Sequence, residues 1–241
     1  MTDAPVTHAP ATGGPATGAA ARPGRPAPDG PADLIVIAKE PVPGRVKTRL
    51  TPAYTAREAA ELAEAALADT LRTAARARAG RRTLALAGEP GPWLPAGFTV
   101  IPQRGGDLDE RLACAFEDAY DGRPLVLIGM DTPQVTAALL ERAGDALGAH
   151  DAVLGPADDG GFWLLGLARP DAALLRGVPM SRPDTGALQL RRLRAAGLEV
   201  APAPRLTDVD TAADAARVAA LAPRGRFAAA VRRLQDRAVP A

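Results

Sequence analysis

Short apolar runs alternate along this chain with longer segments that carry helix start and stop signals. The runs LIVIA at residues 34–38 and LVLI at residues 125–128 are uninterrupted, which is typical of strands that a sheet buries on both faces. The pattern predicts strands at 34–38, 82–87, 98–101, 125–128, 152–154, 162–167 and 198–201. It predicts helices at 55–80, 107–120, 132–148, 185–196, 212–221 and 226–237.

Two of these helices have distinct start signals. Thr55 and Glu58 have the spacing of a capping box, and Thr132 with Pro133 predicts an N-cap followed by a first-turn proline. Buried strands that alternate with helices predict an α/β fold, with a mostly parallel sheet and helices on both faces. Ligands of such sheets bind at the carboxyl ends of the strands, so the loops after strands are where we expect the chemistry.

Composition limits the domain organisation and the class of partner. Residues 1–32 are rich in proline, alanine, glycine and threonine, which predicts a disordered N-terminal tail before one domain at 33–241. Apolar residues make up 47% of the chain, but no run approaches the roughly 18 residues of a membrane span. The single cysteine, Cys114, excludes an internal disulfide and is expected in the core. With a net charge of +1 and no secretory signal, we expect a cytoplasmic protein that acts on small molecules and not on nucleic acid.

Residue types that are nearly absent restrict the chemistry further. The histidines are His8 and His150, so a histidine-centred triad or a histidine-based zinc site is almost excluded. The chain has only two lysines, Lys39 and Lys47, and both fall in one loop after the first predicted strand. Every other basic side chain is arginine, which suggests that these two positions require a compact ammonium group.

Residues 39–50, called the basic loop from here on, have the composition of a phosphate-binding turn. Its candidate ligand-binding residues are Lys39, Gly44, Arg45, Lys47 and Arg49. Glycine permits close approach of the backbone and the cations attract phosphate, although the Walker A spacing is absent. The alternative is a solvated basic loop. We expect the loop to be exposed, so that Lys47→Arg would reduce turnover and leave the fold intact.

Three carboxylates follow predicted strands and form a candidate metal site. Asp131 comes directly after the run at 125–128, and Asp208 and Asp210 would face one side of an extended segment. These carboxylates repel one another, and a divalent cation would relieve that repulsion. Because all donor atoms are oxygens, we expect the cation to be Mg²⁺ or Mn²⁺. Neutralising Asp131 or Asp210 would then leave the metal-free protein at least as stable. The alternatives are that Asp131 and Asp210 only assist helix N-termini.

Two glycine-rich turns and the only serine complete the candidate substrate site. One turn contributes Gln103, Gly105 and Asp107 before a helix, where it suits a base or a phosphate. The other contributes Asp159, Gly160 and Gly161, either as a tight turn with amides open to a ligand or as an ordinary hairpin turn. Ser181 lies in an irregular stretch and is a candidate substrate contact.

These motifs in this order resemble a bacterial glycosyltransferase-A-fold family of the nucleotide-diphosphosugar transferase superfamily, linked to radical-SAM proteins and arsenosugar biosynthesis. The motifs are residues 38–39, PGRVKTRL at 43–50, QRGGDL at 103–108, IGMDTP at 128–133, DGGFWL at 159–164 and DVDT at 208–211. The chain is more distantly similar to 2-phospho-L-lactate guanylyltransferases, which share a Lys-(Ser/Thr)-Arg-Leu loop and paired late aspartates. The resemblance covers residues 33–222 and implies a glycosyltransferase-A-like nucleotide-binding transferase domain.

Carried over by position, the resemblance implies that the basic loop holds the phosphates of a nucleotide. The cations concerned are Lys39, Arg45, Lys47 and Arg49. It also implies that Asp131, Asp208 and Asp210 hold the metal. Two positions depart from the family pattern: Asp109 stands where glycine is usual, and Met180 stands where tryptophan is usual before the serine.

Three functions follow from these expectations. The first is a metal-dependent glycosyltransferase with an NDP-sugar donor and a small-molecule acceptor, in which Lys47 and Asp131 act at the reacting phosphates. The second is a nucleotidyltransferase, similar to the guanylyltransferases, that couples an NTP to a small phosphorylated acid or a similar acceptor. The third is an inert nucleotide-binding regulatory domain, which the three surviving aspartates argue against. The sequence leaves the nucleobase, the sugar, the acceptor and the oligomeric state open.

Overall fold

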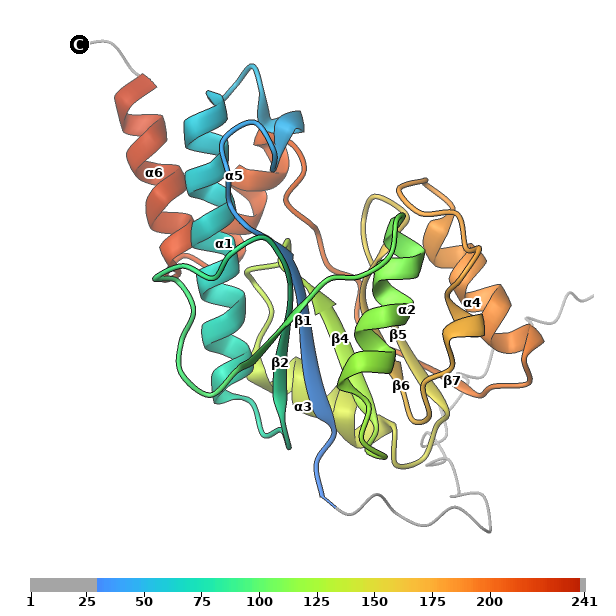
Figure 1. Cartoon of the computed structure of the whole chain (residues 1–241). Helices are drawn as coiled ribbons and strands as arrows, with labels where there is room; N and C mark the ends of the chain where they lie inside the picture. Colours follow the sequence, from blue (N-terminus) through green and yellow to red (C-terminus); the bar gives the residue numbers. More distant parts are fainter. Residues whose placement is uncertain (1–29, 239–241) are drawn as a thin grey trace, which may run out of the picture.

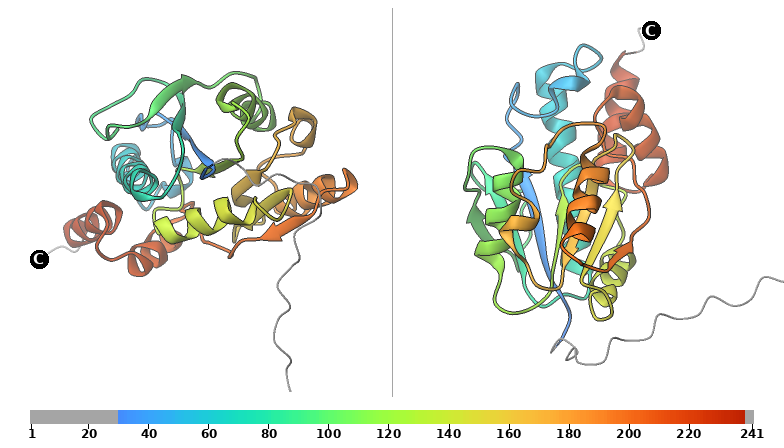
Figure 2. Two further views of the ribbon diagram at one scale, coloured as in Figure 1. Left: turned by 90° about the horizontal axis from the view of Figure 1, so that it is seen from below. Right: turned by 90° about the vertical axis from the view of Figure 1, so that its right-hand side faces the viewer.

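The computed structural model describes residues 30–238 as a seven-stranded sheet with helices on both faces (Figures 1 and 2). The strands are β1 (Asp33–Lys39), β2 (Arg82–Ala87), β3 (Thr99–Pro102), β4 (Leu125–Gly129), β5 (Ala152–Pro156), β6 (Phe162–Leu167) and β7 (Val200–Pro202). The helices are α1 (Ala56–Arg76), α2 (Leu108–Ala119), α3 (Ala137–Ala146), α4 (Thr185–Ala195), α5 (Ala212–Leu221) and α6 (Arg226–Ala238), with short 3₁₀ helices η1 (Thr48–Leu50) and η2 (Ala172–Leu174).

The strand order β3-β2-β1-β4-β6-β5-β7 confirms the predicted α/β architecture with a mostly parallel sheet. Only β6 runs antiparallel to its neighbours, β4 and β5, and every other pairing is parallel. The carboxyl ends of six strands, and the start of β6, therefore lie at one edge of the sheet, which is the upper edge in Figure 1. This edge collects the loops in which the sequence predicted the chemistry.

Strand β1 shows why the sheet is covered on both faces. Leu34 and Val36 belong to the core that α1 and α3 cover, whereas Ile35 and Ile37 belong to the core under α2 and α4. Side chains alternate between the two faces of a strand, so a strand buried on both sides needs an unbroken apolar run. The run that predicted this strand is the direct result of that requirement.

A third core lies beside the sheet, where α6 packs against both α1 and α5 (Figure 1). It buries side chains from all three helices together with Leu50 of the basic loop, Tyr54 before α1 and Val209 of the segment before α5. Leu50 and Val209 are each 1% exposed. The third core therefore holds two candidate loops in fixed positions relative to α1.

The two predicted helix starts have different outcomes. The capping box of Thr55 and Glu58 is confirmed, with both reciprocal hydrogen bonds present at the start of α1. The predicted N-cap at Thr132 is wrong: α3 begins one turn later, where Thr136 accepts a hydrogen bond from the Leu139 amide. Residues 132–135 instead form a turn, in which the Val135 amide donates to the carbonyl of Thr132.

The remaining predictions about organisation can be compared directly with the structure. Of the predicted tail at 1–32, residues 1–29 lie outside the described residues, and Ala32 is buried in the core. Cys114 is a free, buried residue of α2, as expected. Within residues 30–238, no helix combines the length and the apolar character that crossing a bilayer requires.

The turn between β5 and β6 is held by backbone contacts with the segment that leads into α4. Gly160 has φ +89°, its carbonyl accepts the Gly186 amide at 2.8 Å, and a Cβ at position 160 would collide with the carbonyl of Pro183. A Cβ at Gly186 would come within 2.5 Å of the Gly161 carbonyl. These glycines are required because two backbones meet there without room for side chains.

We therefore expect Gly160→Ala to cost about 2 kcal/mol more in unfolding free energy than Gly97→Ala. Gly97 has the same φ of +89° but nothing within 4 Å of its added Cβ, so it isolates the cost of the backbone conformation alone. Urea unfolding of the two variants measures the difference. Equal losses would show that the Pro183 contact carries no cost.

Candidate active site

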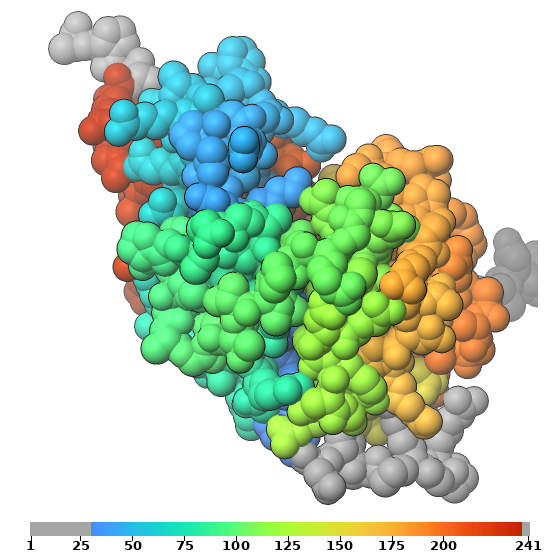
Figure 3. All heavy atoms as spheres, viewed as in Figure 1, coloured from blue at the N-terminus to red at the C-terminus, as the bar shows by residue number. Residues whose placement is uncertain are grey.

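Five segments bring polar side chains to the upper edge of the sheet. They are the basic loop after β1, the turn at 103–107 after β3, residues 130–132 after β4, the β5–β6 turn, and residues 205–210 after β7. In the space-filling view the surface is indented at this edge, between the blue and cyan residues around the basic loop and the green start of α2 (Figure 3). The structure thus places almost every predicted site residue along one edge.

Lys47 lies at the centre of this group. Its Nζ is 2.8 Å from Asp131 Oδ1 and 3.4 Å from Asp210 Oδ1, and it donates a hydrogen bond to the backbone carbonyl of Val209. Its side chain is 8% exposed, so the ammonium group is surrounded by protein oxygens and not by water. Much of the basic loop is exposed, as expected, but the Lys47 side chain is not.

The local structure of the basic loop explains this burial. Val46 is buried in the core over α1, and Leu50 is buried in the third core, so the loop is anchored on both sides of Lys47. Lys47 itself adopts the left-handed conformation, with φ 48° and ψ 38°, immediately before η1. This turn of the backbone directs its side chain inward, between the loop after β4 and the segment after β7.

The segment after β7 supplies acceptors on the other side of Lys47. The Val209 side chain fills the third core, and its amide donates to the backbone carbonyl of Asp131 at 2.9 Å. Arg49 Nη1 lies 2.9 Å from Asp210 Oδ2. The predicted phosphate loop, the residue after β4 and the paired aspartates are therefore joined in one network.

Burial disfavours the charged form of Lys47, but the carboxylates of Asp131 and Asp210 outweigh that penalty. Together they hold the pKa of the ammonium group above its ordinary value. Lys47 is therefore a permanent cation of the site at neutral pH. Neutralising Asp131 would leave this buried charge with fewer partners, so the pairing with Lys47 argues against the expectation that the change leaves the metal-free protein at least as stable.

Three carboxylates lie close enough together to share a cation. Asp159, Asp208 and Asp210, called the carboxylate cluster from here on, each place an oxygen within 4.8 Å of the other two. Two of the predicted metal ligands are thus brought together, while the third, Asp131, is paired with Lys47 instead. Asp159 is the third member of the cluster, although the sequence analysis expected it to contact the substrate. Its signal was the acidic pair at 158–159 in the β5–β6 turn.

The carboxylate cluster has an electrostatic signature of its own. The pKa of Asp208 is raised to about 6, first by burial and then by the charges of Asp159 and Asp210, while Lys47 opposes the shift. All donors are carboxylate oxygens, which suits Mg²⁺ or Mn²⁺ better than softer metals. The residues present therefore fit a hard divalent cation.

Hydrogen bonds of neighbouring residues hold the segments of the carboxylate cluster together. Thr207 Oγ1 donates to Asp158 Oδ2 at 2.5 Å, and Gln134 Nε2 donates to the Thr207 carbonyl at 2.5 Å. The Asp158 amide also donates to the Leu206 carbonyl. These bonds fix the β5–β6 turn against the segment that carries Asp208, so the carboxylates are held close together despite their repulsion.

Some of the other predicted ligand-binding residues are free to bind a ligand, and others already form hydrogen bonds within the protein. Lys39 and Arg45 are exposed and have no ion-pair partner among residues 30–238. The Gln103 side chain donates to the carbonyls of Ala38 and Ala85, so its amide nitrogen ties β1 to β2. Ser181 is exposed, with φ 57°.

Glycine amides of both glycine-rich turns form internal hydrogen bonds, and in the turn at 103–107 it is Gly106 that donates, to Glu110 Oε2 at 2.7 Å. Gly160 donates to the carbonyl of Ala157 and Gly161 donates to Asp159 Oδ1, so the prediction of open amides in that turn is wrong. In the other turn Gly105 has φ +95°, and Asp107 is the N-cap residue of α2 without a side-chain cap bond. The exposed Asp107 carboxylate and Gly44 of the basic loop remain open to a ligand.

The two departures from the family pattern have structural roles. Asp109 Oδ2 accepts the Gly177 amide at 2.7 Å and so connects α2 to the segment after η2. Met180 packs against the core under α2 and α4. Both residues fix the stretch that leads to Ser181 and the start of α4.

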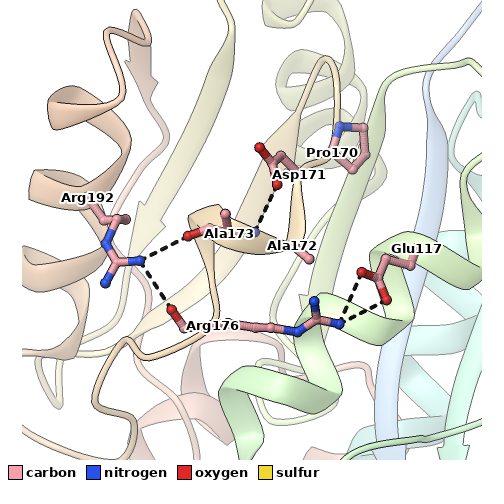
Figure 4. A pocket seen from close by; sticks show the side chains of 7 residues that line it. All are labelled: Glu117, Pro170, Asp171, Ala172, Ala173, Arg176 and Arg192. Atoms are coloured by element: carbon pink, nitrogen blue, oxygen red, sulfur yellow. Dashed lines mark hydrogen bonds and ion pairs between the residues drawn. The ribbon is translucent and has the colours of Figure 1, made fainter.

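A separate surface pocket lies away from this edge, where β6 ends and η2 packs against α2 (Figure 4). Its two arginines are already engaged: Arg176 pairs with Glu117 at 3.1 Å, and Arg192 donates to the carbonyls of Ala173 and Arg176. The pocket follows the end of β6 opposite to the β5–β6 turn, so it does not belong to the carboxylate cluster.

Comparison with known proteins places this geometry in a family. A bacterial family described as uncharacterized protein conserved in bacteria (DUF2064) matches residues 55–182, more than half of the chain. The chain belongs to this family. A search of curated proteins found no match to this chain.

Solved structures show the same fold. A protein from Desulfovibrio desulfuricans G20, provisionally named a nucleotide-diphospho-sugar transferase, is 29% identical, with a TM-score of 0.76 over 85% of this chain and 95% of that chain. CMP:2-keto-3-deoxy-manno-octonic acid synthetase in complex with CTP is 12% identical, with a TM-score of 0.52 over 80% and 98% of the two chains. 4-Diphosphocytidyl-2C-methyl-D-erythritol synthase from Anaerococcus prevotii DSM 20548 is also 12% identical, with a TM-score of 0.51 over 81% and 98%. The predicted nucleotide-diphospho-sugar transferase fold is confirmed.

In the metal-free protein, Asp208→Asn should raise the thermal unfolding midpoint by a few degrees at about pH 8 and have little effect near pH 4. The pKa of Asp208 is raised from 3.8 to about 6 in the folded state, so the folded protein binds this proton more tightly than the unfolded chain. Stability from this group is therefore present at low pH and is lost as pH rises through that window.

Thermal unfolding with a chelator present, recorded across that pH range, measures the effect. Asp236→Asn on the exposed side of α6 is the control, because it changes the net charge equally and lies outside the site. An Asp208→Asn variant that is less stable than the natural protein at both pH values would contradict the electrostatic interpretation.

Proposed function

We propose that this DUF2064 protein is a metal-dependent transferase whose donor is a nucleotide-diphosphate sugar. The observation that carries the proposal is the carboxylate cluster beside the buried Lys47, at the carboxyl edge of a parallel sheet. The fold shared with the 29%-identical Desulfovibrio protein supports the nucleotide-diphospho-sugar class. The narrower link to radical-SAM proteins and arsenosugar biosynthesis belongs to this proposal as well.

In this proposal, different residues of the site bind the metal, bind the phosphates and stabilise the developing charge. Asp159, Asp208 and Asp210 would hold Mg²⁺ or Mn²⁺, which when bound neutralises the charge that develops on a departing diphosphate. Lys39 and Arg45 are exposed cations of the basic loop without an ion-pair partner among residues 30–238, and they can bind phosphate oxygens from the solvent side. Lys47 holds its positive charge at a fixed position in the same site, which is the condition for electrostatic stabilisation of a transition state.

Asp131 has a different position from the other carboxylates. Its side chain is 43% exposed and shares Lys47 with Asp210, so it borders both the lysine and the open side of the site. Its direct ligation of the metal stays a prediction. Its pairing with Lys47 supports a role in orienting the ammonium group, and its exposure leaves it accessible to an acceptor.

A second candidate function is nucleotidyl transfer, with attack on the α-phosphate of an NTP. The concentration of four cations on one loop favours it, because a triphosphate carries more negative charge than the diphosphate of a sugar nucleotide. The cytidylyltransferase-like structures share only the fold, so they do not decide between the two reactions. The two candidates differ in the bond that is broken, and the released product therefore separates them.

We expect the protein to release a nucleoside diphosphate from NDP-sugars when Mn²⁺ or Mg²⁺ and an acceptor mixture are present. The assay separates NDP by chromatography in parallel with a pyrophosphate assay on the four NTPs. Release of pyrophosphate without NDP would replace glycosyl transfer by nucleotidyl transfer. Asp159→Asn should abolish either product and weaken Mn²⁺ binding at least about tenfold, whereas Asp107→Asn, outside the cluster, should leave Mn²⁺ binding unchanged.

Lys47→Arg should reduce turnover about 100-fold, because the longer planar guanidinium cannot occupy the same position among Asp131, Asp210 and the Val209 carbonyl. The buried position also predicts a loss of about 1–3 kcal/mol in stability from overpacking. Steady-state kinetics and urea unfolding measure the two effects.

Lys39→Arg is the matched control, since Lys39 is exposed on the same loop and arginine can keep its charge there. We expect this variant to retain the stability of the natural protein. Near-native turnover of Lys47→Arg would show that the site requires only a diffuse positive charge.

A further inference from the structure

Asp210 belongs to two groups at once. It is a member of the carboxylate cluster with Asp159 and Asp208, and it is also paired with two cations of the basic loop. Lys47 Nζ lies 3.4 Å from its Oδ1, and Arg49 Nη1 lies 2.9 Å from its Oδ2. Both oxygens of Asp210 therefore face a positive charge in the metal-free protein.

The two cations differ in their freedom to move away. The Arg49 side chain is 68% exposed, so it can leave Asp210 for water at little cost. The Lys47 side chain is 8% exposed, and its ammonium group is enclosed by Asp131, Asp210 and the carbonyl of Val209. Such oxygens are the same kind of ligand that a hard divalent cation takes. Lys47 therefore lies among these oxygens as an internal cation.

We propose that Lys47 is the counter-ion of the metal-free site, and that Lys47 and a divalent cation compete for Asp210. The inference rests on the proposed metal-dependent function and adds that metal binding releases Lys47 from Asp210 before Lys47 binds the donor. A cation held by the carboxylate cluster would repel the Lys47 ammonium group from Asp210, while Asp131, which lies 2.8 Å from Lys47 Nζ in this structure, would continue to pair with it. The ammonium group is then free to bind a phosphate oxygen of the donor.

This competition makes binding of metal and donor cooperative. Coupling between two sites is reciprocal, so the same repulsion that displaces Lys47 also weakens the affinity of the free protein for the metal. A donor phosphate that accepts Lys47 removes the penalty. The protein should accordingly bind Mn²⁺ weakly alone and more tightly with a nucleoside diphosphate present.

The scarcity of lysine provides a direct test in the natural protein. Lys39 and Lys47 are its only lysines, so brief acylation followed by peptide mass spectrometry reports on each side chain separately. Without metal, Lys39 should react and Lys47 should be protected. With saturating Mg²⁺, Lys47 should become several-fold more reactive, because it loses Asp210 as a partner and becomes accessible to the reagent, whereas Lys39 should not change.

A pair of variants measures the competition from the side of the metal. Lys47→Met removes the ammonium group and keeps the length of the side chain, and it should tighten Mn²⁺ binding about tenfold by electron paramagnetic resonance. Lys39→Met removes the same charge from the exposed end of the loop and should change the affinity less than about twofold. Circular dichroism and thermal unfolding establish that both variants are folded.

Each outcome has a separate meaning. Equal tightening in both variants would show a general field effect and overturn the competition. Mn²⁺ binding to the natural protein, with Lys47 still protected from acylation, would overturn the inference and leave the metal-dependent transferase in place. If neither the natural protein nor the variants bind Mn²⁺ or Mg²⁺, both the inference and the proposed function fail.

Discussion

A buried ammonium group is the constraint on which the arrangement of the site depends. Lys47 is almost completely removed from water, and a charge in that position is tolerated only with oxygen partners on several sides. Those partners come from two other segments of the chain, Asp131 after β4 and Val209 with Asp210 after β7. The need to solvate one cation therefore fixes three loops relative to one another.

Apolar packing makes this polar arrangement possible. Leu50 and Val209 are buried in the third core with α1, α5 and α6, so each loop carries an apolar anchor beside the residue that acts in the site. The aspartates on both sides of Val209 are half-buried, because the Val209 side chain occupies the core while theirs do not. α5 and α6 thus contribute to the site although neither supplies a predicted site residue.

The site also contains stored repulsion that a ligand can relieve. The pKa of Asp208 is raised first by burial and then by the charges of Asp159 and Asp210, so the negative charge of the carboxylate cluster is only partly compensated by Lys47. Lys39 and Arg45 are exposed cations without an ion-pair partner among residues 30–238. An excess of negative charge at the cluster beside an excess of positive charge at the loop is complementary to a metal–diphosphate complex.

The sequence by itself determined the strands, most helices and the edge at which the chemistry lies, because an unbroken apolar run and a capping box are local physical requirements. It also identified Lys47, one of only two lysines, and Asp208 and Asp210, which lie two residues apart after a predicted strand. Only the tertiary structure decided that Lys47 is buried and that Asp159 joins the carboxylate cluster in the place expected for Asp131. Such contacts depend on how distant loops meet in space, and residue spacing along the chain does not encode that distance.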